Sequence, residues 1–225
     1  AISLLISFFL EEPIHSQEVS KITPSLTIIE EGLKLLGENS NLRRIILLSV
    51  VAYPLLVYLY LLYQPYFVES GVPSSLFGIF LAIASFISLI SVKYTYKLEK
   101  WIGAEKTLFC VTLLPGLIYI VMAIIHQKIV SPLLFCLMYL PGGMYEPLFS
   151  DYQNRHIQSD NRATVLSMIN MFSSLYIVIS GFVIGFIADK SISYAFIFMG
   201  LIILFGSIMF RLPREQTSPV KETKL

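Results

Sequence analysis

Hydrophobic and polar positions alternate along the chain in long blocks rather than in short repeats. Six apolar segments, each close to the roughly 20 residues that a helix needs to cross a bilayer, are separated by short polar stretches. Four groups of turn-forming residues mark three of the five breaks: Gln64-Pro65 and Gly71-Val72-Pro73 in the first, then Ser131-Pro132 and Asp189-Lys190-Ser191. The pattern therefore predicts six membrane helices within residues 43–212, over 44–63, 76–92, 107–125, 132–150, 163–188 and 192–212.

Three further segments flank this predicted bundle. Residues 1–10 form an apolar run too short to span a bilayer and without the features of a signal peptide, which predicts the end of a truncated membrane helix. Residues 11–42 predict a cytoplasmic connector, with an amphipathic helix around Leu26, Ile29, Leu33 and Leu36. Residues 213–225, rich in Lys, Glu and Thr, predict a disordered cytoplasmic tail.

Composition agrees with a membrane protein. Of the 225 residues, 56% are hydrophobic and only 14% are charged, with a mean hydropathy of +0.74. The net charge of +1 comes with no basic face, so a nucleic-acid partner is not expected. Cys110 and Cys136 lie inside apolar runs and are expected to act as small hydrophobic residues rather than as a disulfide or metal pair.

Basic residues gather on one side of the predicted membrane. The opposite side carries only Lys128 and Lys190. By the positive-inside rule the basic side is cytoplasmic, and so is the C-terminus. The basic side holds Lys21, Lys34, Arg43, Arg44, Lys93, Lys97, Lys100, Lys106, Arg155, Arg162, Arg211, Arg214, Lys221 and Lys224.

Polar side chains are concentrated on four of the six predicted spans. The third and sixth are almost wholly apolar, as expected of helices that face lipid, whereas the second carries a small-residue stripe that permits close helix approach. Tyrosines in such helices often serve packing, and serines often bond their own helix, so both readings stay open. The candidate residues of a substrate path are Tyr53, Tyr60, Gln64, Ser85, Tyr139, Tyr145, Asn170 and Ser174.

The predicted fourth span is interrupted by prolines and a glycine pair, and it carries Glu146 beside them. A carboxylate at membrane depth is costly to bury, which makes it a candidate functional group. Two roles fit: a protonatable coupling group, or a latch that pairs with Arg162 or Lys93 at the cytoplasmic gate. The latch is favoured because intramembrane charges usually pair. Asp151 and Arg155, one helical turn apart, predict a similar pair.

Motifs of enzymes are missing from the sequence. It contains no HExxH, GxSxG, Walker or CxxC pattern, and its three histidines lack ligand spacing. An intramembrane hydrolase or transferase would need a paired nucleophile and base that the pattern does not offer. The sequence therefore predicts a protein that is not an enzyme and that needs neither cofactor nor metal.

Together these features resemble the C-terminal half of a major facilitator superfamily transporter. Three stretches look like bacterial members of the superfamily: residues 63–67 (YQPYF), the segment from Arg155-His156-Ile157 to 162–167 (RATVLS), and residues 181–189 (GFVIGFIAD). The loop 98–106 is similar to the acidic-basic-Gly-basic signature of the superfamily. It differs in having Glu for Asp, an extra residue before Gly103, and Ala104-Glu105 in place of basic residues.

The resemblance implies an all-α membrane fold in which the six spans are helices seven to twelve and residues 1–10 end helix six. Helices seven, eight, ten and eleven would line a cavity, facing a missing N-terminal six-helix half. It further implies alternating access with proton exchange, in a multi-pass protein of a bacterial inner or plasma membrane. A cavity rich in tyrosine and poor in charge favours an efflux antiporter for amphipathic or drug-like solutes. The alternative is a membrane receptor or complex subunit, in which Glu146 and Asn170 would be packed shut.

Overall fold

The computed structural model describes residues 40–156 and 162–210. The predicted helix end at 1–10, the amphipathic helix of the connector and the tail at 213–225 lie outside the described residues. Within the described part the chain is helical and contains no strand, as predicted. The elements are α3 (Ser40–Glu69), the short 3-10 helix η1 (Ser74–Leu76), α4 (Phe77–Ile102), α5 (Ala104–Ile124), α6 (Val130–His156), α7 (Arg162–Ala188) and α8 (Ile192–Met209).

Five of these helices are long and apolar enough to cross a membrane: α3, α4, α5, α7 and α8. This agrees with a multi-pass membrane protein and matches the first, second, third, fifth and sixth predicted spans. The predicted fourth span corresponds to α6, which has 27 residues but is not among the five. Its prolines, glycines and Glu146 lower its hydropathy, so its crossing of the membrane stays a prediction.

The expected interruption of α6 is wrong, because the helix runs continuously through Pro141 and Pro147. A proline inside a helix removes one backbone donor and favours a kink. Here side-chain burial on both sides of the prolines holds the helix together: Met138 is 1% exposed, and Tyr145 and Leu148 are 3% and 2% exposed. Tertiary packing therefore outweighs the local helix-breaking signal.

Several helix ends also differ from the prediction, most clearly those of α3 and α4. The turn expected at Gln64-Pro65 is wrong, since α3 continues to Glu69 and buries Tyr66 and Phe67 completely. Likewise α4 continues ten residues past the predicted end of its span, to Ile102. The true turns have glycine in the left-handed region, at Gly71 with φ 71° and at Gly103 with φ 86°, where a side chain would be strained.

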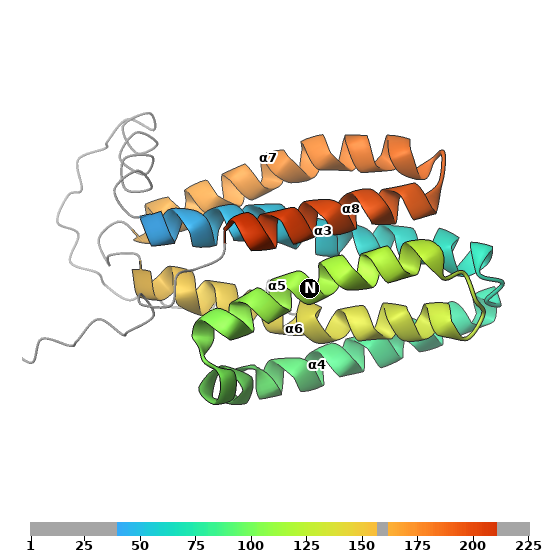
Figure 1. Cartoon of the computed structure of the whole chain (residues 1–225), viewed down its shortest axis with the longest axis horizontal. Coiled ribbons are helices and arrows are strands. Elements are labelled where there is room, and N and C mark those ends of the chain that lie inside the picture. The colour runs from blue at the N-terminus through green and yellow to red at the C-terminus, as the bar shows by residue number, and fades with distance from the viewer. Residues whose placement is uncertain (1–39, 157–161, 211–225) are drawn as a thin grey trace, which may run out of the picture.

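Consecutive helices from α3 to α8 run in opposite directions along the long axis of the molecule (Figure 1). One end holds the start of α3, the α4–α5 turn, the end of α6 and the start of α7, and the opposite end holds η1 and the α7–α8 turn (Figure 1). The described basic residues are correspondingly concentrated at the first end. Lys128 and Lys190 belong to connections at the second end.

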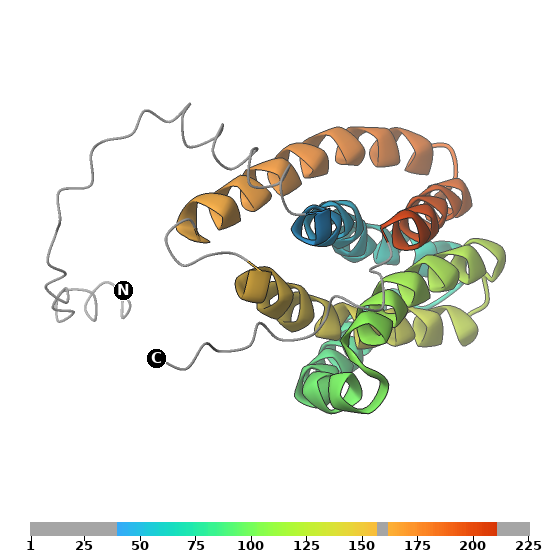
Figure 2. The same cartoon turned by 60° about the vertical axis from the view of Figure 1, so that its left-hand side comes forward.

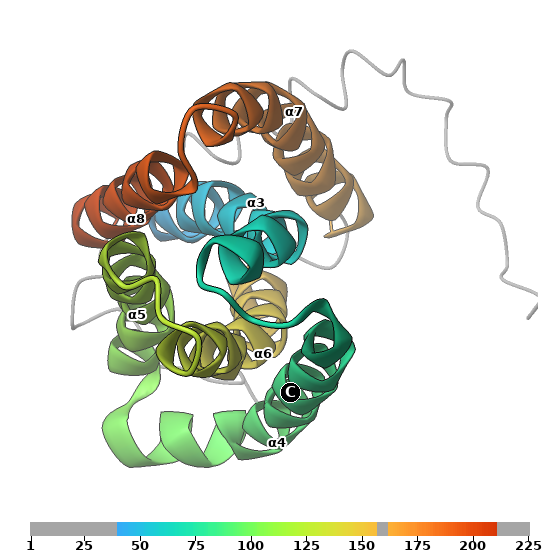
Figure 3. The ribbon, with the colours of Figure 1, turned by 90° about the vertical axis from the view of Figure 1, so that its right-hand side faces the viewer.

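Helix α3 lies at the centre and contacts α6, α7 and α8 (Figure 2). Viewed along the bundle, α4 and α7 lie at opposite sides with α3 and α6 between them (Figure 3). Helices α5 and α8 pack against each other at the left of this view. This arrangement leaves one flank of α3 and α6 bordered by α4 and α7. The candidate site lies along that flank.

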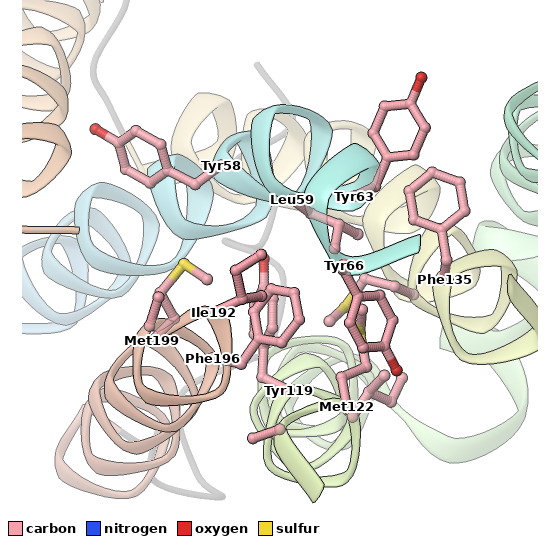
Figure 4. Close-up of a cluster of buried hydrophobic side chains, with 14 of the residues drawn as sticks. Tyr58, Leu59, Tyr63, Tyr66, Tyr119, Met122, Phe135, Ile192, Phe196 and Met199 are labelled. Atoms are coloured by element: carbon pink, nitrogen blue, oxygen red, sulfur yellow. The ribbon is translucent and has the colours of Figure 1, made fainter. Parts of the chain in front are cut away.

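The core is rich in aromatic rings and sits between α3, α5, α6 and α8. Figure 4 shows Tyr66, Tyr119 and Phe196 converging from three helices, with ring centroids 5.1 Å apart for Tyr66–Phe196 and 5.5 Å for Tyr119–Phe196. The Tyr119 hydroxyl donates to the Leu55 carbonyl at 2.5 Å, and the Tyr66 hydroxyl donates to the Ile125 carbonyl at 2.7 Å. Each buried phenol thus ties two helices together through a satisfied hydrogen bond.

A polar cluster joins the helix ends at the η1 end of the bundle. The Glu69 carboxylate lies 3.4 Å from His126 Nδ1, and Ser193 Oγ lies 2.8 Å from His126 Nε2. These contacts link α3, the segment after α5, and α8. Glu69 is about half exposed, so its contact with His126 contributes little by itself.

The expectation that the two most apolar helices face lipid is too simple. The most apolar stretches of α5 and α8 are 56% and 44% buried, compared with 11% for those of α4 and α7. Both α5 and α8 keep exposed apolar residues, such as Ile124 and Phe205, on their outer faces. Their inner faces are apolar because they pack against each other, so uniform apolarity does not mark the most exposed helices here.

Helices α5 and α8 approach closely at two glycines. A β-carbon on Gly200 would lie 2.9 Å from the Gly116 carbonyl oxygen and 2.8 Å from Ile120 Cδ1. A backbone carbonyl cannot rotate away, so any side chain at this position pushes the helices apart.

We expect Gly200→Ala to lower the unfolding temperature of the detergent-solubilised protein by roughly 3–10 °C, the effect of about 1–3 kcal/mol of overpacking. Gly185→Ala is the matched control, because no atom lies within 4 Å of a β-carbon there. Circular dichroism during heating measures both. Equal unfolding temperatures for the two variants would contradict the close contact.

Candidate functional site

Two pockets lie along the flank of α3 and α6. The first, here the Tyr60 pocket, has a volume of about 300 Å³ and lies between α3, α4 and α6. Its wall is mostly apolar, with phenol rings and one serine as its polar groups. It is lined by Tyr53, Leu56, Val57, Leu59, Tyr60, Ser88, Met138, Tyr139 and Gly142.

The second, here the Glu146 pocket, has a volume of about 320 Å³ and lies between α3, α6 and α7. It is more polar than the Tyr60 pocket, because hydroxyls, two amides and one carboxylate reach its wall. It is lined by Ser49, Tyr53, Tyr145, Glu146, Phe149, Ser150, Gln153, Leu166, Ile169, Asn170 and Ser173.

Tyr53 belongs to both pockets and connects them. Its ring stacks on Tyr145 with centroids 5.7 Å apart, and Tyr145 stacks on Phe149 at 4.2 Å. Tyr53 is 41% exposed whereas Tyr145 is 3% exposed, so Tyr53 is the exposed end of the stack. The result is an aromatic column whose exposed end suits contact with another flat apolar group.

Hydrogen bonds fix the buried base of this column. The Tyr145 hydroxyl donates to the Ser49 carbonyl at 2.9 Å, and Gln153 Nε2 donates to Ser49 Oγ at 3.2 Å. Ser49 Oγ in turn donates to the Ile46 carbonyl at 2.8 Å. With these donors and acceptors paired, α3 and α6 hold the polar wall of the Glu146 pocket in one arrangement.

The structure brings together most of the predicted path residues. Tyr53, Tyr60 and Tyr139 line the Tyr60 pocket, and Tyr53, Tyr145 and Asn170 line the Glu146 pocket with Glu146 itself. Asn170 is exposed to the open space rather than packed shut. Residues from α3, α6 and α7 that are far apart in sequence therefore share one wall.

Three predicted residues lie elsewhere. Gln64 is exposed and its Nε2 donates to the neighbouring Tyr63 hydroxyl at 3.2 Å. Ser85 is exposed and its hydroxyl donates to the Leu81 carbonyl of its own helix at 2.9 Å. Ser174 is also exposed and is not among the lining residues. For Ser85 the ordinary role of bonding to its own helix is the one observed.

Glu146 is exposed to the pocket on a helix whose neighbouring residues Tyr145 and Leu148 are buried. Within the described residues no ion pair joins its carboxylate to Lys93, one of the two expected latch partners. The side chains of Arg155 and Arg162 lie outside the described part, so a pairing of Glu146 with Arg162 or of Asp151 with Arg155 stays a prediction. Asp151 is partly buried and does not line either pocket.

Sequence reasoning missed Ser49, Gln153 and Ser173 as lining residues. Helical spacing could have found all three, because each shares one helix face with a predicted residue: Gln153 follows Glu146 by seven residues, Ser173 follows Asn170 by three, and Ser49 precedes Tyr53 by four. An extension of each polar stripe by one or two turns would have identified these positions.

The chemistry of the two pockets is set by the side chains that line them. No group of three or more His, Cys, Asp or Glu residues that could hold a metal ion occurs in the described ranges 40–156 and 162–210. The available groups are aromatic faces, hydroxyls, amides and a carboxylate, which suit a small solute and a proton. Comparison of the chain with protein-family models, curated proteins and solved structures finds no match.

Proposed function

We propose that this chain forms one half of a secondary transporter of the major facilitator superfamily, which moves a small amphipathic solute across the cell membrane by alternating access. The observation that carries the proposal is a carboxylate, Glu146 on α6, in an open pocket of about 320 Å³ whose other two walls, α3 and α7, are long and apolar enough to cross a membrane. An ionisable group at such a position marks a substrate or proton path. In this proposal the end of the bundle rich in Lys and Arg is cytoplasmic.

The pocket walls define the solute class of the proposed transporter. Volumes of about 300 and 320 Å³ lie at the small end of ligand sites, and the two pockets share Tyr53, so an elongated solute could occupy both. The aromatic column binds a flat apolar part, while Asn170 and Ser173, which are not buried and line the Glu146 pocket, bind polar parts. Glu146 takes up and releases a proton as the half rocks against its partner bundle, which couples solute efflux to proton entry.

The alternative, a non-transporting receptor or complex subunit, makes a different demand on the same residues. Its polar groups would serve packing, with Glu146 and Asn170 closed off from solvent. Both residues are exposed and line the same pocket, which supports the transport proposal over the alternative.

The proposal is tested by Tyr53→Ala in the complete transporter that the proposal requires, this chain together with its partner bundle, reconstituted in proteoliposomes with an imposed pH gradient. We expect the apparent affinity for lipophilic aromatic dyes to fall about 2- to 13-fold, the loss of one aromatic stacking partner worth about 0.5–1.5 kcal/mol. Tyr194→Ala is the matched control, because Tyr194 is a 63% exposed tyrosine on α8 and lines neither pocket. The measurement is dye movement as a function of dye concentration.

The outcomes separate the proposals. Reduced affinity in Tyr53→Ala but not in Tyr194→Ala supports a solute site at the aromatic column. Transport that is unchanged in both variants would mean that the solute binds elsewhere. If the native protein moves no solute in either direction, the transport proposal loses its support and the receptor alternative is favoured.

A further inference from the structure

The last three turns of α4 carry a face that the pockets do not use. Lys93, Lys97 and Lys100 follow one another at spacings of four and three, which place them on one side of the helix. All three are exposed. Within the described residues none of these ammonium groups forms an ion pair, so the positive charge of this side is left open.

Large aromatic rings flank the three lysines. Tyr94 is 46% exposed, Tyr96 71% and Trp101 83%. Lys97 Nζ lies 5.2 Å from the centroid of the Tyr94 ring, so this lysine and this ring are neighbours on the helix surface. Exposure of such large rings to water is unfavourable, whereas Tyr and Trp are stabilised at the headgroup level of a bilayer.

The opposite side of the same turns is packed into the protein. Ser91 and Thr95 are 3% and 5% exposed, and the Tyr152 hydroxyl of α6 lies 3.5 Å from Glu99 Oε1. The carboxylate of this segment therefore turns toward α6, away from the lysines. Beyond the Gly103 turn Lys106 is exposed and Glu105 is partly buried, so the excess of positive charge continues onto α5.

The position of this face restricts its partner. It begins where the apolar part of α4 ends and lies at the end of the bundle that collects the basic residues (Figure 1). If α4 crosses the membrane, these turns lie in the headgroup layer. An acidic protein or nucleic acid would suit the lysines, but would leave the three rings without an apolar surface to contact.

We propose that Lys93, Lys97, Lys100 and the flanking rings, here the lysine face, bind the headgroups of anionic phospholipids. The ammonium groups contact the phosphates, and the rings lie among the glycerol and upper acyl carbons. This inference does not depend on transport and holds equally for a receptor. It needs only that α4 is inserted in a bilayer.

Trp101 provides the test, because the chain contains one Trp. The protein is reconstituted in phosphatidylcholine vesicles with a minor fraction of phosphatidylglycerol, and either lipid is supplied with brominated chains, which quench Trp fluorescence on contact. At equal brominated fraction we expect phosphatidylglycerol to quench Trp101 several-fold more efficiently, up to roughly fivefold for each lysine engaged.

Three variants separate charge from structure. Combined Lys93→Gln, Lys97→Gln and Lys100→Gln is expected to remove the preference for phosphatidylglycerol, whereas the same three positions changed to Arg keep it. Combined Lys128→Gln and Lys190→Gln, at the other end of the bundle, also keeps it. If circular dichroism shows that the Gln variant does not fold, the native protein is tested at increasing salt concentration instead. The preference for phosphatidylglycerol should then disappear at about 1 M salt, which screens this attraction.

Equal quenching by the two lipids in the native protein would overturn the proposal. So would a preference that survives in the folded Gln variant, or one that persists unchanged at about 1 M salt. Solute transport is not read out in this experiment, so its result is independent of the proposed function.

Discussion

Replacement of Glu146 by Gln is expected to abolish proton-driven solute movement in proteoliposomes, down to the level of protein-free vesicles. Gln keeps the size and hydrogen-bonding shape of Glu but cannot bind and release a proton. Glu146 is exposed in its pocket and unpaired with Lys93, so its neutralisation breaks no ion pair among the described residues. The fold should therefore persist while coupling is lost.

The measurement compares dye movement with and without an imposed pH gradient. Asp189→Asn is the matched control, because it also neutralises one carboxylate, but at the exposed α7–α8 turn outside both pockets. We expect Asp189→Asn to retain gradient-driven movement.

A second readout distinguishes the two roles considered for Glu146. If it binds the coupling proton, Glu146→Gln should still exchange dye without a gradient but should not respond to one. If it instead acts as a latch with Arg162, the variant should keep its response to the gradient with an altered rate. Full gradient-driven transport in Glu146→Gln at the native rate would contradict both roles.

The number of long helices could be predicted because each is encoded by a continuous apolar block. The exact ends could not, because local signals compete with packing there. Gln64-Pro65 is typical of a turn, yet burial of Tyr66 and Phe67 carries α3 past it. Lys93 to Lys100 suggest a loop by charge, but Lys and Glu are good helix formers and the buried face of α4 continues through Thr95.

The candidate site was predictable where one helix face determines it. A spacing of seven placed Tyr53 and Tyr60 together, and both line the Tyr60 pocket. Helical spacing could have added Ser49 and Gln153 to these faces, but it could not predict the hydrogen bond between them, which joins α3 and α6 across 104 residues of sequence. Nothing in either local segment encodes that pairing.

The small-residue stripe of α4 shows the same limit. Gly78, Ala82, Ser85 and Ser88 were expected to permit close helix packing, yet the first three are exposed. Only the last residue of the stripe, Ser88, takes part in the close contact with α6, together with Ser91. Period and residue size predict that a helix can pack closely, but not which turns of the helix do so.

That contact makes Gly143 the more restricted of the two glycines of α6. A β-carbon there would lie 2.3 Å from Ser91 Oγ and 2.6 Å from both Ser88 Oγ and the Ser88 carbonyl oxygen. The hydroxyls can rotate, but the carbonyl belongs to the α4 backbone, so the two helices would have to separate. We expect Gly143→Ala to lower the unfolding temperature in detergent by roughly 3–10 °C or more, measured by circular dichroism.

The neighbouring Gly142 supplies the control. No atom lies within 4 Å of a β-carbon at Gly142, so Gly142→Ala should leave the unfolding temperature unchanged or raise it, since Ala favours a helix over Gly by about 1 kcal/mol. Adding Ser91→Ala to Gly143→Ala removes the nearest clash but not the carbonyl, so it should restore only part of the loss. Full restoration would mean that the hydroxyl alone sets the limit, and equal stability of the two single variants would contradict the close approach of α4 and α6.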